Sequence, residues 1–582
     1  MSKYFLITTA LESTWNLNSK TVFLGEWCKL YKKKSIWEKM DTITNQYHWN
    51  DREKYYSDYQ YLNSLYEKKL SLLSQKLGTM HGITKNIRFW RIIIGPWLKF
   101  FIDSVFDRYE NISLLNKSYK VEDTLILQYK LKEWAPNDFE NFYKQLTSDE
   151  WNHVIFSECI KNMGLSYTKL DIKLESLDES QINFKDKLIN SLILLTNKLT
   201  PSFLNKIVIV QPNISIRKLF KFQFKLRQIP FLWRKQKFNL SKNFNINKRL
   251  LLKDDSVENG YEQLLDRLIV NLMPLNYVEN FNIFYKKSLA CYPKKPSIIY
   301  TANAYQGNDS FKFWLAHHVE KKIPFVLGQH GGNMGIERFN QPEDHQVSIA
   351  DIFISWGWHN YKKTNIKPLP TPQLDKMQPK FKWDGDIIMT LSDYPRYFYV
   401  HAGIPAASQV LEYIGEQIEF INSLNINLRK SLKIRLQYDK FNWNLEKRIE
   451  DSGYKYSLED TRQNFISRLN DCSLSVSTTN STTFLETLSL NFPTIVFFNA
   501  NWVEIREDAK LLVNSLRRVG ILHKTPRSAA IFLNKLDGNI ENWWCDEELQ
   551  RVRKEFCNSY ASKNSNWSHQ WQQLFESLEN KK

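Results

Sequence analysis

From Ser297 onward, short apolar runs typical of buried β-strands alternate with segments that have helical spacing. The first strand candidates are Ser297–Thr301, Pro324–Leu327 and Ile352–Ser355, and Ser310–Lys321 between them has helical periodicity. Such alternation predicts a parallel sheet covered by helices, because two parallel strands need a long crossover connection that a helix usually forms. We therefore expect an α/β protein.

A second series of the same kind begins at Asp386. Its strand candidates are four short runs of aliphatic, β-branched and small residues: Ile387–Leu391, Leu432–Leu436, Leu474–Ser477 and Thr494–Phe498. Helical segments, among them Ala407–Leu424 and Thr482–Leu490, separate them. The 582 residues exceed the roughly 250–300 that one hydrophobic core usually serves, so at least two domains are expected.

The N-terminal part of the chain has a different pattern. Tyr4–Thr8 and Val22–Leu24 read as two short strands, and Asp51–Leu77 and Asn86–Tyr109 read as long helices. The predicted domains are an N-terminal α/β domain (1–360) with a helical insertion at about 40–290, a Pro- and Lys-rich linker (361–383), a nucleotide-binding α/β domain (384–535) and terminal helices (536–582) that can pack back on the first domain.

Basic residues outnumber acidic ones by 80 to 62, giving a net charge of +18. An anionic partner would explain this excess, and so would compositional bias in a chain rich in Lys, Asn, Ile and Tyr. Arg217–Lys237 holds eight basic residues, no acidic residue and interleaved aromatic rings. This segment fits contact with anionic lipid, a solvated face over a hydrophobic core, or a nucleic-acid patch.

The cysteines and the chain start bear on the compartment. The six cysteines are far apart and form no C-x-x-C pair, so neither a zinc site nor a disulfide framework is predicted. The first ten residues read as a strand and not as a signal peptide, and Ile87–Tyr109 has too many polar breaks for a membrane-spanning helix. We expect a cytoplasmic protein, peripheral at the inner membrane if Arg217–Lys237 binds lipid.

The most informative segment is Ser473–Glu486, in which a strand ends in a run of hydroxyl side chains and a helix begins at once. The free N–H groups and positive dipole of a helix start favour a phosphate. The predicted donor-binding residues lie at this helix start and one turn further on: Asn480, Ser481, Thr482, Thr483 and Glu486. A capping box, Thr483-x-x-Glu486, needs no ligand, but it explains only two of these residues.

Two further segments could contact the same phosphate. Gly328–Gly335 follows a strand and carries His330, which can donate to a phosphate or transfer a proton, beside Gln329 and Gly331. A glycine-rich turn with a hydrogen-bonded histidine is the alternative. Arg435 lies within a strand candidate and could fork onto a phosphate, or it could be an ordinary surface arginine.

Several strong motifs are absent from the sequence, among them G-x-G-x-x-G after a strand, G-x-x-x-x-G-K-[ST], H-E-x-x-H and G-x-S-x-G. Asp384-Gly385-Asp386 spells the D-x-D of metal-dependent sugar transferases, but at the linker exit it reads as a turn. We therefore predict no metal and no cofactor.

Six segments together resemble a family of transferases found in bacterial O-antigen and capsule loci. In chain order they are Thr8–Glu12, Leu24–Cys28, Arg88-x-x-Arg91-x-x-x-Gly95-Pro96-Trp97, Gly328–Gly332, Asp351-x-x-x-x-Trp356-Gly357 and Asn480–Thr483 with Glu486. More distantly, the Gln-His-Gly loop and the Ser-Thr-Thr…Glu helix are similar to GT-B enzymes that use cytidine nucleotides, including Kdo transferases of capsule assembly and teichoic-acid glycerophosphotransferases.

The resemblance implies a GT-B-like fold, with two doubly wound Rossmann-like domains facing a cleft and a helical insertion in the N-terminal domain. It also implies a glycosyltransferase of surface polysaccharide that moves a sugar, with a CMP-linked ulosonic acid as preferred donor, onto a lipid-linked or glycan acceptor. A polyol phosphotransferase using CDP-glycerol or CDP-ribitol, a sugar-nucleotide epimerase or hydrolase, and, last, a nucleic-acid binder remain as alternatives.

Glycosyl transfer from a nucleotide needs positioning, charge stabilisation on the departing phosphate, and a base for the acceptor proton. Arg435 and His330 are the candidates for the phosphate charge. Glu12 and Glu26, in loops after the first two strand candidates, are the candidate bases. Helix-capping or salt-bridge carboxylates are the alternative for both.

Overall fold

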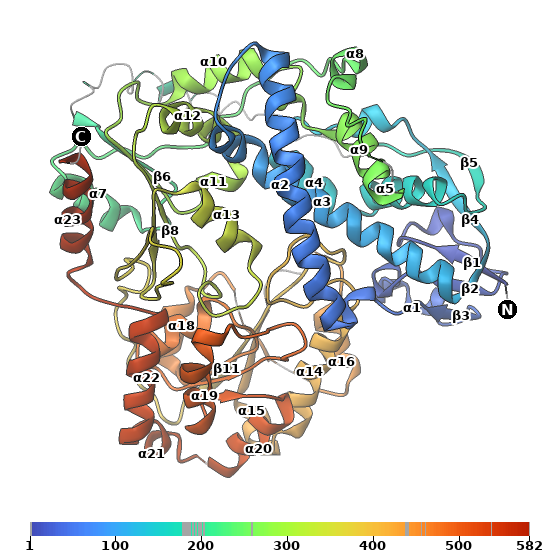
Figure 1. Ribbon diagram of the computed structural model, residues 1–582. Helices are drawn as coiled ribbons and strands as arrows, with labels where there is room; N and C mark the ends of the chain where they lie inside the picture. The colour runs from blue at the N-terminus through green and yellow to red at the C-terminus, as the bar shows by residue number, and fades with distance from the viewer. Residues whose placement is uncertain are drawn as a thin grey trace. The chain divides into compact units, whose positions relative to one another are not determined.

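The computed structural model describes residues 3–176, 188, 191–192, 195, 201, 204–257, 260–436, 441–454, 457–459, 461–536 and 538–580. Within these ranges the chain forms three β-sheets with helices packed on them (Figure 1). The strands of the first and third sheets all pair in parallel. The α/β class of fold that the sequence predicts is thereby confirmed.

The first sheet has the strand order β3-β2-β1-β4-β5. Its strands are β1 (Lys3–Ile7), β2 (Thr21–Phe23), β3 (Thr42–Thr44), β4 (Lys120–Gln128) and β5 (Thr168–Lys173). The chain winds outward from β1 in one direction and then returns to build the other side with β4 and β5, as in a Rossmann sheet. The predicted strands at 4–8 and 22–24 are confirmed as β1 and β2.

Two long helices follow the first strands. Helix α2 (Arg52–His81) begins at Asp51, whose side chain accepts from the N–H groups of Glu53 and Lys54, and ends at Gly82 in the left-handed conformation. Helix α3 (Ile87–Ser118) is buried around most of its circumference and packs against α2, α5 (Asp149–Asn162) and α12 (Asp309–Glu320). Among the described helices, none is long and apolar enough to cross a membrane.

The second sheet has the order β10-β9-β8-β7-β6. Its strands are β6 (Ile207–Val210), β7 (Ile298–Thr301), β8 (Phe325–Gly328), β9 (Ile352–Ser355) and β10 (Ile366–Pro368). The strands predicted after Ser297 are confirmed, but they form a sheet separate from β1 and β2. The predicted N-terminal domain (1–360) includes both sets of strands, and its bounds stay a prediction. Strand β10 falls within the segment predicted as a linker.

The third sheet has the order β13-β12-β11-β14-β15-β16. Its strands are β11 (Asp386–Leu391), β12 (Leu432–Leu436), β13 (Ser457–Leu458), β14 (Cys472–Ser477), β15 (Thr494–Phe497) and β16 (Leu522–His523). This is the doubly wound order of a Rossmann sheet, with its switch point between β11 and β14. All six residues of β14 are buried.

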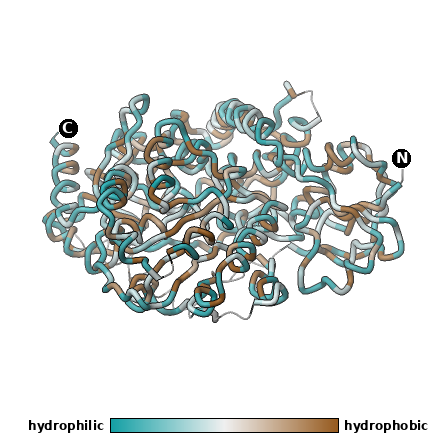
Figure 2. The backbone as a smooth tube through the Cα atoms, turned by 90° about the horizontal axis from the view of Figure 1, so that it is seen from below, coloured by the Kyte–Doolittle hydropathy of each residue, from teal (hydrophilic) through white to brown (hydrophobic). Residues whose placement is uncertain are grey.

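Helices cover this third sheet. They include α14 (Gln409–Ser423), α18 (Thr482–Ser489), α19 (Lys510–Arg518), α20 (Pro526–Leu536) and α22 (Glu547–Tyr560). Helix α22 packs against both α18 and α19, and α14 packs against α20. Figure 2 shows that hydrophobic and hydrophilic stretches alternate along the backbone.

The contacts divide the chain into two compact units, each made of three stretches. Unit 1 comprises Met1–Pro212, Gln223–Val326 and Tyr397–Val400. Unit 2 comprises Asn213–Phe222, Leu327–Arg396 and His401–Lys582.

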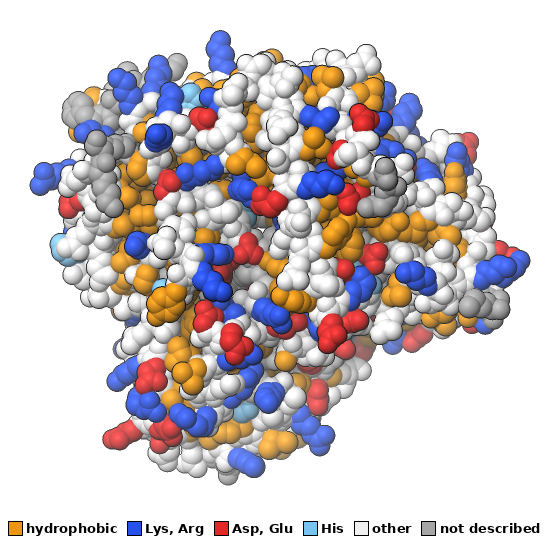
Figure 3. Space-filling view, in the orientation of Figure 1, with side chains coloured by type: hydrophobic (Ala, Val, Ile, Leu, Met, Phe, Trp, Pro, Cys, Tyr) orange, Lys and Arg blue, Asp and Glu red, His pale blue; other side chains and the backbone are white. Residues whose placement is uncertain are grey.

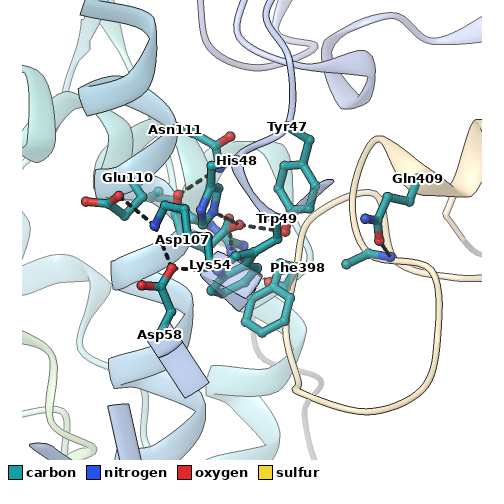
Figure 4. A network of polar contacts seen from close by, with 12 residues as sticks. Tyr47, His48, Trp49, Lys54, Asp58, Asp107, Glu110, Asn111, Phe398 and Gln409 are labelled. Atoms are coloured by element: carbon teal, nitrogen blue, oxygen red, sulfur yellow. Dashed lines mark hydrogen bonds and ion pairs between the residues drawn. The ribbon is translucent and has the colours of Figure 1, made fainter. Parts of the chain in front are cut away.

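A buried polar network stabilises unit 1 (Figure 4). Asp107 of α3 accepts hydrogen bonds from Tyr47 (2.7 Å) and Arg108 (3.0 Å) and contacts the His48 ring at 3.1 Å. Arg108 also donates to the backbone carbonyl of Phe398 (2.7 Å). Burial opposes ionisation of Asp107, but the contacts with His48 and Arg108 outweigh it and hold its pKa below the ordinary value. The short stretch 397–400 is thus bound into unit 1 by charge-assisted hydrogen bonding.

The basic and aromatic segment Arg217–Lys237 is partly occupied by internal contacts. Phe222 is 2% exposed and packs on Trp567, Trp571 and Phe575 of α23 (Trp567–Glu579). Basic and acidic side chains are interspersed on the face shown in Figure 3. These contacts favour the reading of a solvated face over a hydrophobic core, and lipid contact stays a prediction.

Candidate donor-binding site at the start of helix α18

The start of α18 lies at the switch point of the third sheet. Strand β14 ends at Ser477, next to β11, and four residues connect it to the first helical residue, Thr482. Ligands of doubly wound sheets bind outside the carboxyl ends of the strands at such a point. The N-cap residue is Ser481, so the alternative interpretation of Thr483 and Glu486 as a capping box does not hold.

The loop carrying His330 lies against this helix start. The Gly332 N–H donates to the Thr482 hydroxyl oxygen at 3.2 Å. A Cβ atom on Gly332 would come within 2.6 Å of the Ser481 carbonyl group and 2.7 Å of the Thr482 nitrogen. Two segments that the sequence analysis singled out separately, 150 residues apart, are therefore in contact.

This close approach predicts that Gly332→Ala is destabilising. The added methyl group would meet backbone atoms, which cannot swing away as a flexible side chain would, so we expect a loss of about 1–3 kcal/mol in the free energy of unfolding of unit 2. Gly331→Ala is the matched control, because its Cβ would have the Asn333 side-chain oxygen at 3.6 Å as its nearest neighbour. Urea denaturation of both variants measures the difference, and equal midpoints would contradict the described contact.

A pocket of about 710 Å³ opens beside the helix start, within unit 2. Thr482 and Glu486 of α18 line it, together with Lys376 and Lys218. Lys376 forms an ion pair with Glu486, and Lys218 forms one with Asp375 at 2.9 Å. The remaining walls combine short polar side chains, from Asn213, Ser215, Asn464 and Ser467, with apolar ones, from Ile214, Pro372, Met377 and Ile466. Two lysines, two carboxylates and several hydroxyl groups thus line one cavity, a combination that can recognise a phosphorylated ligand with hydroxyl groups.

The predicted histidine is largely enclosed. Burial lowers the pKa of His330 to about 4, and a hydrogen bond with Gln346 only partly opposes this. The imidazole is therefore neutral at pH 7, so it can donate or accept a hydrogen bond but supplies no positive charge for a phosphate.

The side chain of Gln329 is held by hydrogen bonds within the protein. Its side-chain oxygen accepts from the Trp356 N–H (2.9 Å) and the Trp358 indole (2.7 Å), and its amide group donates to the Gly331 carbonyl (2.7 Å). These three bonds fix the loop before Gly332. They favour a role for Gln329 in shaping the loop over direct contact with a donor.

Arg435 donates to the backbone carbonyls of Thr461 (3.3 Å) and Gln463 (2.7 Å), and its guanidinium lies 5.7 Å from the centre of the Phe465 ring. The arginine is half-buried on β12. These contacts favour the alternative of a structural arginine over the phosphate role.

The candidate bases of the first domain are both in ion pairs. Glu12, in the turn after β1, pairs with Lys33 at 2.8 Å, and Glu26, in the turn after β2, pairs with Lys29 at 2.8 Å. Glu12 follows the strand at the switch point of the first sheet, where a site of that sheet would lie. The salt bridges agree with the alternative interpretation, and the catalytic role of either carboxylate stays a prediction.

Sequence reasoning missed Glu337, the most enclosed carboxylate near this site. Its oxygens accept from Asn480 (3.2 Å), Asn333 (3.0 Å), Asn340 (3.2 Å) and the Gly403 N–H (2.9 Å). Burial raises its pKa to about 8, although these hydrogen bonds act in the opposite direction. Asn480, predicted to bind the donor, thus joins the α18 start to the loop after His330 through Glu337.

The fit of Gly403 to this carboxylate is close. A Cβ atom at Gly403 would come within 2.5 Å of the Glu337 carboxyl carbon, so only glycine admits the contact.

Among the residues that the structure describes, no group of three or more His, Cys, Asp or Glu side chains could hold a metal ion.

The sequence profile of one protein family matches nearly the whole chain, from residue 4 to residue 575. The chain is an α/β protein with a polar helix start at a Rossmann switch point, and it belongs to the LIC12162 family of transferases. None of the curated protein sequences matches it.

Solved structures show partial similarity. MnaA of S. aureus in complex with UDP is 13% identical, and the match covers 64% of this chain and 96% of that one with a TM-score of 0.37. The spinosyn rhamnosyltransferase SpnG is 11% identical, with 64% and 100% covered and a TM-score of 0.31. WaaG, a glycosyltransferase involved in lipopolysaccharide biosynthesis, is 10% identical, with 51% and 95% covered and a TM-score of 0.24.

Proposed function

We propose that this transferase is a glycosyltransferase of surface-polysaccharide biosynthesis. It would move a sugar from a nucleotide donor, with a CMP-linked ulosonic acid as the preferred donor, onto a lipid-linked or glycan acceptor. Membership of a transferase family supports group transfer. The observation that carries the choice of donor site is the pocket at the α18 start, where Thr482, Glu486 and Lys376 share one cavity.

In this proposal the donor phosphate lies at the helix start. The N–H groups of the first turn and the hydroxyl groups of Thr482 and Thr483 would bind its oxygens, and the helix dipole would stabilise the charge that grows as the sugar leaves. Lys376 would move from Glu486 to the phosphate. Glu486 would then be free to accept hydrogen bonds from the ribose hydroxyl groups.

His330, being neutral, would act through hydrogen bonding or proton transfer and not through charge. Glu12 or Glu26 of unit 1 would take the proton from the acceptor hydroxyl group, since both follow strands of the first sheet, which also has a Rossmann-like strand order. Glu337 would act as a positioning residue, because it holds Asn480 and the loop after His330 together.

A thermal-shift screen of the full chain against CMP, CDP, UDP, GDP and TDP tests the donor site, because a bound ligand raises the unfolding temperature by mass action. We expect the cytidine nucleotides to give the largest shift. Glu486→Ala should lower the affinity for that nucleotide about 10-fold or more, since hydrogen bonds to a charged acceptor contribute about 1.5–3 kcal/mol. The control is Glu507→Ala, which removes a carboxylate of unit 2 that is 87% exposed.

If Glu486→Ala bound the nucleotide with unchanged affinity, the proposal that the donor site lies at α18 would be wrong. Turnover assays then separate the reactions that share such a pocket. Transfer from CDP-glycerol but not from CMP-sugars would indicate a polyol phosphotransferase, and consumption of donor without any acceptor would indicate an epimerase or hydrolase.

A further inference from the structure

We propose that unit 1 carries a second binding site, which recognises an acidic oligosaccharide. The site is a pocket of about 630 Å³ bounded by the turn at Leu131–Trp134, by helix α4 (Phe139–Leu146) and by residues 242–244. Its lining includes three lysines, three amides and one aromatic ring: Lys132, Lys144, Lys242, Asn141, Gln145, Asn243 and Phe244. We call it the α4 pocket.

The charge of the α4 pocket favours an anion. Its three lysines face a single carboxylate in the lining, that of Glu133. Glu140, the residue before Asn141, pairs with Lys235 (2.5 Å), with Lys237 (3.5 Å) and, at 3.6 Å, with Lys144 of the pocket. Lys235 and Lys237 end the basic segment Arg217–Lys237, so part of that segment has a defined place beside this pocket.

Gln145 indicates that the ligand also carries hydroxyl groups. The residue is only 6% exposed and lines the pocket. Within the described part of the chain, its side-chain oxygen is buried without a hydrogen-bond partner. A buried amide oxygen left unsatisfied is unfavourable, and a donor such as a sugar hydroxyl group would satisfy it once the amide turned toward it.

The remaining lining residues fit the same ligand class. The Asn141 amide offers donors and an acceptor to hydroxyl groups, and the Phe244 ring offers an apolar surface for the C–H face of a pyranose. Carboxylate or phosphate groups on the saccharide would meet the lysines. Neutral saccharides would satisfy the amides but would not match the excess of positive charge in the lining.

The inference rests on the proposed function, because it assigns the acceptor polymer to unit 1. It narrows the substrate class to polysaccharides that carry negative charge on their repeating units. The α4 pocket would hold a stretch of that polymer and thereby raise the effective concentration of its reacting end.

Direct titration of the full chain tests this inference. The probes are an oligomer of N-acetylneuraminic acid and, as a neutral saccharide, maltohexaose, measured by calorimetry at low and at physiological salt. We expect the acidic oligomer to bind and its affinity to fall with salt. The double variant Lys144→Ala and Lys242→Ala should bind it about 10-fold more weakly or worse. The control removes two exposed lysines of β5, Lys169→Ala and Lys173→Ala, and should bind like the parent.

Equal binding of maltohexaose and the acidic oligomer would overturn the ligand class, and full affinity in the α4-pocket variant would overturn the site. CMP titration of the same proteins keeps the two proposals apart. Failure of the parent chain to bind the acidic oligomer, with CMP binding observed, counts against the α4 pocket alone. Failure of the parent chain to bind CMP, with binding of the acidic oligomer observed, counts against the donor site alone.

Discussion

Arg108→Met should lower the free energy of unfolding of unit 1 by about 3–5 kcal/mol, because it breaks a buried ionic network by removing one partner. The Arg108 side chain is fully buried and bonds to Asp107 (3.0 Å), to Asn152 (2.8 Å) and to the Phe398 carbonyl (2.7 Å). Methionine has a similar length and keeps the packing, so the loss reports the polar bonds. Urea denaturation followed by tryptophan fluorescence measures it.

Arg551→Met is the matched control, since that guanidinium is 57% exposed and pairs with Glu555 on the surface of α22. Exposed pairs of this kind contribute about 0–1 kcal/mol, so its midpoint should barely move. Should Arg108→Met unfold at the same urea concentration as the parent, the network would not stabilise unit 1. A rise in stability would mean that the desolvation of Arg108 costs more than its three bonds contribute.

Glu337→Gln should change how stability depends on pH. The pKa of Glu337 is raised by burial to about 8 in the folded protein, against an ordinary value of 4.5. A carboxyl group with a raised pKa contributes stability that is complete below about pH 4.5 and is lost as the pH rises toward 8. The parent should therefore lose about 1–4 kcal/mol more than Glu337→Gln between pH 5 and pH 8.

The readout is the difference between the two unfolding curves at each pH, which cancels every other titrating group. The glutamine side chain offers the four surrounding N–H donors one oxygen in place of two, so some of these donors lose their partner. This adds a destabilisation that does not depend on pH. Glu507→Gln, at an exposed position, should leave the pH dependence unchanged. A difference between parent and Glu337→Gln that stays constant from pH 5 to pH 8 would show that the four donors, and not burial, control this carboxyl group.

The sequence predicts several of the apolar elements, but it misses the nine-residue strand β4 and the fully buried strand β6. The strands at 352–355 and 432–436 and the long helices α2 and α3 appear where periodicity places them. Strands β13 and β16 have two residues each, which is too short for any pattern. Strand β5 is missed for another reason, because its side chains are mostly exposed and therefore lack the alternation that burial imposes.

The candidate site is predicted in part. A run of hydroxyl residues after a strand and a Gly-Gly turn after another are local signals, and both segments meet at Gly332 and Thr482. Glu337 and Lys376 give no such signal. Their partners Asn480 and Glu486 lie 143 and 110 residues away, and only the folded sheet brings them together.

The way each unit is assembled from three separate stretches limits how this chain can be divided. A fragment that stops at Val326 lacks Phe398, whose carbonyl accepts from Arg108, and it lacks Tyr397, whose hydroxyl donates to Asp149 at 2.5 Å. Neither unit could be exchanged between relatives as one continuous segment of sequence. Recombination within such a gene would be expected to preserve only those crossovers that carry the four-residue stretch along with its distant partners.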